Sequence, residues 1–193
     1  MPVAPQALAH VVYRTRRIAE MLDWYSKVFG ASIQHQNPAM AFLTFDDEHH
    51  RFAFLDLSVI DPEGSEPETK GWTGVDHLAW TYPSLKDLFD NYISCKANGI
   101  KPYWCVHHGL TISMYYADPD GNQMEFQVDA FDSADDCNAY IRGSAFETNP
   151  VGVEFDPQDW ISAVHDGASL DDFRTRKVHE PVSPIRGAVS ELL

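Results

Sequence analysis

Three side chains that can bind a metal ion occupy related places in the sequence. His10 lies in the apolar segment Leu8–Tyr13, and His77 lies in the matching segment Gly74–Trp80 one repeat later. Glu125 follows on the last predicted strand of that second repeat. Two imidazoles and one carboxylate on one face of a metal leave its other positions open, as in non-haem Fe(II) oxygenases. These three residues are therefore the candidate metal ligands, although each by itself is more often an ordinary structural residue.

A second group of polar residues lies between Val106 and Glu125. His108 and Tyr115 precede the segment Asp118–Asn122, whose sequence Asp-Pro-Asp-Gly-Asn is typical of a tight turn. The turn joins the predicted strand of Tyr115 to that of Glu125, which would bring three polar groups to one cavity. A hairpin turn alone explains neither the histidine nor the tyrosine.

The elements that must position these residues form a repeat. The strand of His10 precedes a helix that Thr15 can cap and that Gly30 can end. Three strands are then expected, at about 31–36, 40–46 and 50–58.

The second repeat has the same order. The strand of His77 precedes a helix that Ser84 can cap and that Gly99 can end. Its three strands are expected at about 101–107, 111–117 and 122–128. If the last strand lies beside the strand of His77, as compact βαβββ packing allows, the three candidate ligands can converge.

The predicted fold class is α+β, with two βαβββ modules in one catalytic domain and an extended C-terminal tail. The modules span about residues 8–60 and 73–128, the domain residues 1–130 and the tail residues 131–193. Asp61–Gly71 is a linker by its Pro, Gly, Glu and Ser content.

The tail does not repeat either module. It has a helical stretch near Ala134–Arg142 and is expected to be irregular afterwards, with isolated apolar residues such as Phe146, Phe155 and Trp160. Apolar residues of this kind need cover, so the tail is expected to pack on the domain or on a neighbouring subunit, in a homo-oligomer.

These features resemble the vicinal oxygen chelate superfamily, which is built from paired βαβββ modules in a glyoxalase-like fold. The resemblance covers about residues 8–128, and residues 106–125 resemble the signature of type I extradiol ring-cleavage dioxygenases. The matching positions are Val106, His108, Met114, Tyr115, Asp118, Pro119, Gly121 and Glu125. Many members have four modules, so this two-module chain resembles the small single-domain subgroup.

The resemblance implies Fe(II)-dependent extradiol (meta) cleavage of a catechol-type aromatic, such as a 2,3-dihydroxybiphenyl-like compound. Both atoms of O₂ would enter the product, as in the catabolism of aromatic hydrocarbons. It makes His10, His77 and Glu125 the ligands of Fe(II), with Mn(II) as the other metal these donors accept.

The same resemblance assigns catalytic roles to three further residues. His108 would hydrogen-bond the substrate or product, and Tyr115 would hydrogen-bond a catecholate oxygen. The segment Asp46–Phe54 resembles the stretch with the acid–base histidine of the family. Spacing to the following Ala53 favours His50 over His49 for this role.

Composition excludes several other classes of function. The formal net charge of −15 disfavours nucleic acids and anionic membranes as partners. No apolar stretch approaches the roughly 20 residues that span a bilayer, and no secretory signal is visible. Three widely spaced cysteines predict free thiols in a reducing cytoplasm.

Two alternatives remain at this point. A non-oxidative relative, such as a glyoxalase-like isomerase or thiol transferase, would also use a cation held by His and Glu. It would not need His108, Tyr115 and His50 at this spacing. A metal-free binding module would leave His10, His77 and Glu125 unexplained. Bound metal and aerobic turnover of a catechol separate the three.

Overall fold

The computed structural model describes residues 7–64, 74–177 and 180–187. The chain divides into two compact units: residues 1–73 with 118–120, and residues 74–117 with 121–193. Residues 65–71 of the predicted linker lie outside the described residues. The grouping of both modules into one catalytic domain stays a prediction.

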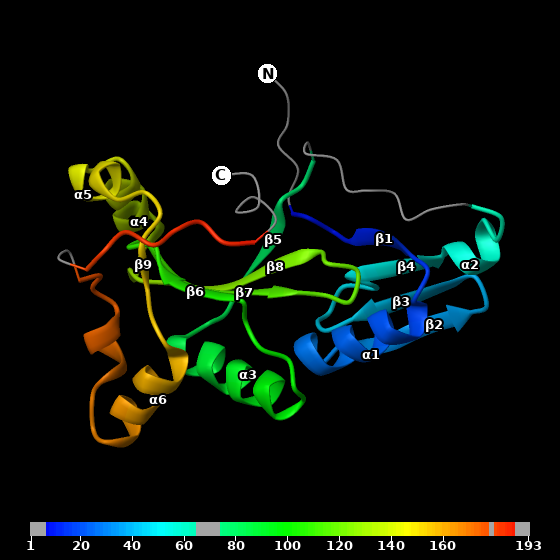
Figure 1. Ribbon diagram of the computed structural model, residues 1–193, viewed down its shortest axis with the longest axis horizontal. Coiled ribbons are helices and arrows are strands. Elements are labelled where there is room, and N and C mark those ends of the chain that lie inside the picture. Colours follow the sequence, from blue (N-terminus) through cyan, green and yellow to red (C-terminus); the bar gives the residue numbers. More distant parts are fainter. Residues whose placement is uncertain (1–6, 65–73, 178–179, 188–193) are drawn as a thin grey trace. The chain divides into compact units, whose positions relative to one another are not determined.

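The first unit has the predicted βαβββ order (Figure 1). Its four-stranded sheet has the order β1-β4-β3-β2, and β1 runs parallel to β4. The elements are β1 (Val11–Thr15), α1 (Ile18–Phe29), β2 (Ser32–Asn37), β3 (Met40–Thr44), β4 (Phe52–Asp56) and the short α2 (Leu57–Ile60).

Helix α1 packs its apolar face on this sheet because its apolar residues recur at helical spacing. Tyr25 is fully buried, and its ring lies edge-on to Phe52 and Phe54 of β4. Gly30 ends the helix in the left-handed conformation, as predicted. The expected cap at Thr15 is wrong: that residue belongs to β1, and its hydroxyl accepts from the Arg17 N–H before the helix begins.

The second unit repeats the order and adds a strand from the tail. Its sheet has the order β5-β8-β7-β6-β9, with β5 parallel to β8. The elements are β5 (His77–Thr81), α3 (Leu85–Ala97), β6 (Trp104–His107), β7 (Thr111–Ala117), β8 (Gln123–Asp129) and β9 (Val153–Glu154). The predicted fold class, two βαβββ modules followed by a tail, is confirmed.

Helix α3 lies along one face of this sheet (Figure 1). Ser84 caps it as predicted, because its hydroxyl accepts from the Asp87 N–H at 3.2 Å. Met124 and Phe126 of β8 are fully buried. Since side chains alternate along a strand, Glu125 points to the opposite face from these two residues.

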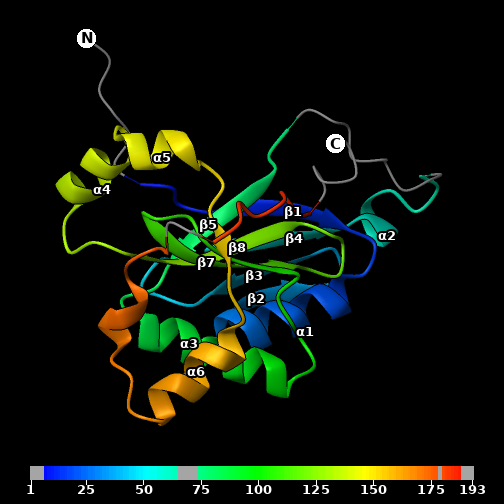
Figure 2. The same ribbon diagram turned by 60° about the vertical axis from the view of Figure 1, so that its left-hand side comes forward.

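The tail is more ordered than its sequence suggests. The predicted helix is present as α4 (Ala134–Ile141), but the expectation of irregular chain after it is wrong (Figure 2). Further elements follow: α5 (Ser144–Thr148), β9, α6 (Pro157–His165) and a 3-10 turn (Leu170–Phe173).

Local chemistry explains the helix that the sequence analysis missed. Asp156 caps α6 and Pro157 occupies its first turn, both of which favour a helix start. The Trp160 ring stacks between Phe155 and Phe173, at centroid distances of 4.1 and 4.7 Å. Part of the tail therefore packs on itself through these three rings, while β9 pairs with β6.

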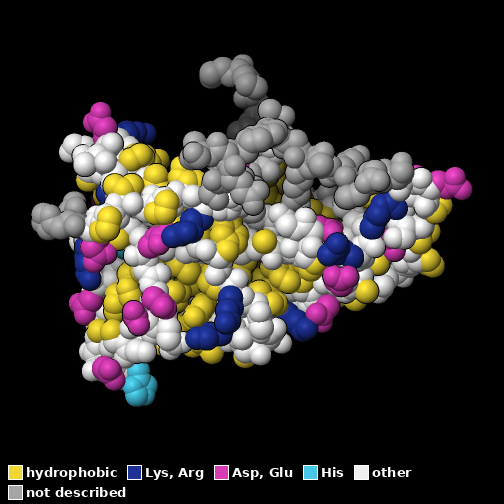
Figure 3. Space-filling model, viewed as in Figure 1, with side chains coloured by type: hydrophobic (Ala, Val, Ile, Leu, Met, Phe, Trp, Pro, Cys, Tyr) yellow, Lys and Arg dark blue, Asp and Glu magenta, His cyan; other side chains and the backbone are white. Residues whose placement is uncertain are grey.

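Charged side chains on the face shown in Figure 3 are interspersed, with lysine and arginine mostly beside acidic groups. Among the described residues, no helix is long and apolar enough to cross a bilayer.

Candidate active site

His77 and Glu125 meet on the second unit because their strands are neighbours. In the parallel pairing of β5 with β8, His77 lies opposite Gln123 and Ala79 lies opposite Glu125. The side chains of His77 and Glu125 therefore share one face, and His77 Nε2 lies 3.0 Å from Glu125 Oε2. The strand pairing assumed from the sequence is confirmed.

A hydrogen-bonded chain behind His77 fixes its orientation. Asp76 Oδ2 lies 2.8 Å from His77 Nδ1, which leaves Nε2 as the nitrogen that faces Glu125. The Gln123 amide donates to the Asp76 carbonyl at 2.9 Å and to its Oδ1 at 3.3 Å. The Tyr103 hydroxyl donates to Gln123 Oε1 at 2.8 Å. Such a carboxylate–imidazole pair sets the tautomer of a metal-binding histidine and raises its basicity.

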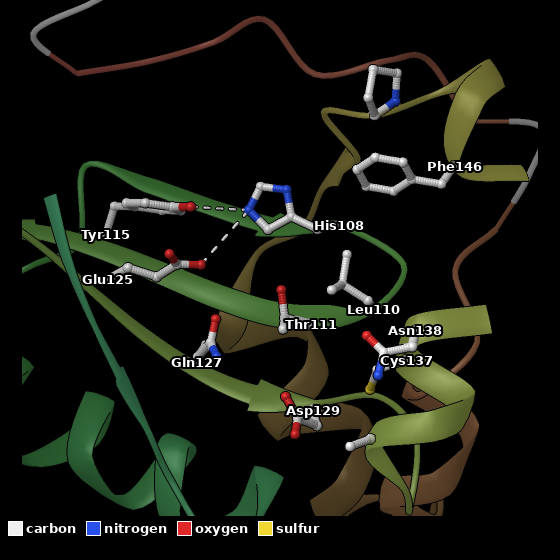
Figure 4. Close-up of a pocket in the computed structure, with 12 residues that line it drawn as sticks. His108, Leu110, Thr111, Tyr115, Glu125, Gln127, Asp129, Cys137, Asn138 and Phe146 are labelled. Atoms are coloured by element: carbon white, nitrogen blue, oxygen red, sulfur yellow. Dashed lines mark hydrogen bonds and ion pairs between the residues drawn. The ribbon is translucent and has the colours of Figure 1, made fainter. Parts of the chain in front are cut away.

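Tyr115 and His108 lie close to Glu125 (Figure 4), and the Tyr115 ring lies edge-on to the His77 ring at a centroid distance of 5.3 Å. Tyr115 on β7 is the direct cross-strand partner of Glu125. Its hydroxyl lies 3.0 Å from His108 Nε2, and that nitrogen lies 3.9 Å from Glu125 Oε1. His108 Nδ1 contacts the carbonyl of Val151 in the tail. Since a carbonyl only accepts, Nδ1 bears the proton and Nε2 accepts from the Tyr115 hydroxyl.

Burial and neighbouring charge shift the pKa values of this group. A hydrogen bond to Glu125 raises the pKa of His77 to about 9. Burial alone would raise the pKa of Glu125, but hydrogen bonds from His77 and Ser113 outweigh it and lower that pKa overall. Burial lowers the pKa of His108 and raises that of Tyr115. Near pH 7 the tyrosine is therefore a hydrogen-bond donor and His108 is neutral.

The donors present fit a divalent metal. Two ligands at right angles on a metal, with bonds of about 2.1 Å, have donor atoms about 3.0 Å apart. The His77 Nε2–Glu125 Oε2 distance of 3.0 Å equals that spacing. Among the described residues, no complete group of three metal-binding side chains is gathered; the structure brings together two of the three predicted ligands.

The first unit gathers a separate group of histidines. His10, immediately before β1, stacks on His50 at a centroid distance of 4.4 Å. His50 also lies edge-on to Phe42 at 5.0 Å, and burial lowers its pKa. The Arg51 guanidinium links the segment of His50 to the segment of His10, since it donates to the carbonyls of Leu8 and Ala9 at 2.7 and 2.9 Å.

His49 does not point away from His50. Adjacent residues of a strand point to opposite faces, but residues 45–51 form a loop before β4, so the strand expected from about residue 50 begins later. The Nδ1 atoms of His49 and His50 lie 2.6 Å apart. The two differ in burial instead: the His49 side chain is 68% exposed, whereas His50 is half-buried against its neighbours.

His107, the neighbour of His108 in the sequence, is a buried residue with a structural role. It is 3% exposed, its Nδ1 accepts from the Gly109 N–H at 3.0 Å, and burial lowers its pKa to about 4. In the unfolded chain the His107 imidazole takes up a proton near pH 6.5, whereas in the folded chain it stays neutral until the pH is near 4. The free energy of unfolding is therefore highest above pH 6.5 and decreases as the pH falls toward 4.

We expect His107→Gln to remove about 2 kcal/mol of the stability difference between pH 7 and pH 5. Urea unfolding of the wild type and the variant at both pH values measures this difference. An unchanged pH dependence in the variant would contradict a neutral, buried His107.

Several groups at the site escaped the sequence analysis. Asp76 could have been found, because it directly precedes His77 and acidic partners of metal-binding histidines are common. Ser113, which hydrogen-bonds Glu125, and the main chain of Val151 have no comparable sequence signal.

Comparison with known proteins gives three similarities. Residues 7–126 match the family model of the Glyoxalase/Bleomycin resistance protein/Dioxygenase superfamily. Biphenyl-2,3-diol 1,2-dioxygenase 2 of Rhodococcus globerulus is 42% identical over 172 residues, which cover 89% of this chain and 88% of that protein. Biphenyl-2,3-diol 1,2-dioxygenase 3 of the same organism is 40% identical over 177 residues, with 91% and 90% covered.

Solved structures show the same fold. A glyoxalase/bleomycin resistance protein/dioxygenase from Nocardioides has a TM-score of 0.51 and 16% identity, covering 66% of this chain and 86% of that chain. At this identity the likeness concerns the fold alone.

Proposed function

The chain belongs to the Glyoxalase/Bleomycin resistance protein/Dioxygenase superfamily and, within it, to the extradiol dioxygenases, and from this membership we propose that it cleaves a catechol-type ring with O₂. The names of the two curated relatives describe a 2,3-diol opened between carbons 1 and 2, which is beside the hydroxyl-bearing pair. The proposed substrate class is 2,3-dihydroxybiphenyl-like. One observation of the site supports it above the others: the oriented His77–Glu125 pair lies against Tyr115 and His108.

We propose His10, His77 and Glu125 as the ligands of Fe(II), with Mn(II) as the alternative. Two of these donors already have the spacing a metal requires, and Asp76 orients one of them. His10 is proposed on the family resemblance and on its matching place in the first module. When bound, such a metal supplies open positions for a chelating diol and for O₂, and accepts and passes on electrons.

The residues around Glu125 can bind and orient the diol. Tyr115, whose raised pKa keeps it protonated, can donate to a deprotonated catechol oxygen. His108 is held neutral, so once the Tyr115 hydroxyl donates to the diol instead, Nε2 can accept a hydrogen bond from a substrate hydroxyl.

His50 is proposed to take up and return the proton that ring opening requires. Its lowered pKa leaves it neutral and able to accept a proton at neutral pH.

The proposal is tested with protein loaded with Fe(II) under anaerobic conditions. On addition of 2,3-dihydroxybiphenyl and air, we expect one O₂ consumed per substrate and a coloured ring-fission product. Consumption of a glutathione hemithioacetal without O₂ uptake would instead show an isomerase. Absence of bound metal and of turnover with either compound would show a binding module.

A small-molecule diol and O₂ follow from the proposed reaction, and the formal net charge of −15 disfavours nucleic-acid or anionic-membrane partners. Three free cysteines support a cytoplasmic location. A homo-oligomer stays a prediction, which sedimentation at micromolar concentration tests.

A further inference from the structure

A cavity in the second unit continues from the candidate site to the helices of the tail (Figure 4). His108, Tyr115 and Glu125 line one end, and α4 and α5 contribute to the other. Its volume is about 420 Å³. That lies within the roughly 300–1,000 Å³ of pockets that hold drug-sized ligands, and exceeds what a single aromatic ring needs.

The far end of this cavity has an apolar wall. Its apolar side chains are Leu110, Ala134, Phe146 and Pro150, and Cys137 and Asn138 of α4 lie near Leu110 (Figure 4). In Figure 4, Phe146 and Leu110 lie beyond His108 as seen from Tyr115. A ring bound beside Tyr115 would thus present a substituent to this wall, and burial of apolar area there would stabilise the complex.

The charges around the cavity are negative. Glu125 and Asp129 are its charged lining residues, and no lysine or arginine is among the described residues that line it. The nearby Arg176 is occupied elsewhere, since its guanidinium donates to main-chain carbonyls. A carboxylate on the substituent, directed away from the proposed metal ligand Glu125, would therefore meet the like charge of Asp129 without a lysine or arginine to pair with.

Arg176 also holds the apolar wall in place. The guanidinium donates to the carbonyls of His108, Asn149 and Ala145, at 3.1, 2.8 and 3.0 Å. Ala145 and Asn149 flank Phe146 on α5 and its cap, so one buried group links the Phe146 helix to the His108 turn. A wall fixed in this way can discriminate between substituents, because it does not collapse when one is missing.

We infer that the C-terminal tail forms a subsite, centred on Phe146 and Leu110, for an uncharged aryl or alkyl substituent of the diol. The same subsite selects against diols that carry a carboxylate. This inference rests on the proposed ring-cleavage function. It means that residues of the tail determine which catechols the enzyme prefers.

The test compares kcat/KM of the Fe(II)-loaded enzyme for three substrates: 2,3-dihydroxybiphenyl, unsubstituted catechol and a carboxymethyl catechol. The wild type should prefer the biphenyl compound and turn over the carboxylated one least. Phe146→Ala should lower kcat/KM for the biphenyl compound by about 10- to 100-fold, the range for losing part of an apolar pocket. Its kcat/KM for unsubstituted catechol should change less than about threefold, since that ring does not reach the wall.

Phe155→Ala is the matched control, because Phe155 is a tail aromatic that stacks on Trp160 and does not line the cavity. It should leave the ratio of the two kcat/KM values unchanged. Leu110→Ala should lower the ratio of kcat/KM for the biphenyl compound to that for unsubstituted catechol, as Phe146→Ala does. The same shift in two variants would show that it does not come from misfolding of one of them. Asp129→Lys should raise the kcat/KM of the carboxylated catechol relative to that of unsubstituted catechol.

The outcomes separate this inference from the proposed function. If the wild type consumes no O₂ with any of the three diols, the proposed function itself is wrong. If it cleaves them but Phe146→Ala and Leu110→Ala leave the ratio unchanged, only the subsite is wrong. A wild type that prefers the carboxylated diol would also overturn the subsite.

Discussion

His77→Ala is expected to lose both the bound metal and all turnover, leaving activity at the level of a metal-free control. The imidazole provides one of the two donors that already lie 3.0 Å apart. Its removal takes one donor from the proposed metal site and removes one of the hydrogen bonds to the buried Glu125 carboxylate. Metal analysis after loading measures the first loss, and O₂ uptake with 2,3-dihydroxybiphenyl measures the second.

Asp76→Asn is the graded control for this substitution. It keeps the proposed ligand but weakens the hydrogen bond that orients it, so metal affinity should fall by about 10- to 100-fold, the usual effect of losing a hydrogen-bond partner of a metal-binding histidine. Excess Fe(II) should then restore much of the turnover. A His77→Ala protein that keeps a full complement of iron would show that His77 is not a ligand.

His50→Gln is expected to retain its metal and to bind catechol almost normally, while kcat falls by about 10²- to 10⁴-fold. The residue is not a proposed ligand, and its proposed role is to hold and return a proton. The half-buried ring, stacked on His10 and edge-on to Phe42, is positioned by its neighbours. Single-turnover measurements with preloaded iron distinguish slow chemistry from slow binding.

His49→Gln is the adjacent control. His49 contacts His50 but is largely exposed, so its replacement should change kcat only several-fold, by disturbing its neighbour. If His49 variants lose turnover while His50 variants keep it, the proton-transfer role belongs to the other histidine. Loss of iron from the His50 variant would make that residue a ligand instead.

Most of the second unit followed from its sequence. The strand predicted at 111–117 is present with those bounds, Ser84 caps its helix, and the pairing of β5 with β8 brings His77 to Glu125. Each of these depends on local periodicity, on a cap or on strand adjacency, which sequence patterns report directly.

Other features depend on contacts that no pattern reports. The side on which His49 lies depends on the conformation of a loop rather than on strand alternation. The order of the tail comes from ring stacking between residues as distant in sequence as Phe155 and Phe173, through Trp160. The acceptor for His108 is a main-chain atom, which residue identity cannot indicate.

That main-chain acceptor has an evolutionary consequence. Because the Val151 carbonyl would survive substitution of its own side chain, point mutations at this residue can vary among apolar types without releasing His108. Insertions or deletions between α5 and β9 would displace the carbonyl, so the length of this connection is constrained more tightly than its composition. Gly152 is the exception, since a Cβ there would lie 2.5 Å from the His107 carbonyl oxygen and its φ is +119°. Divergent copies of this enzyme should therefore keep the spacing and this glycine, while drifting elsewhere in the connection.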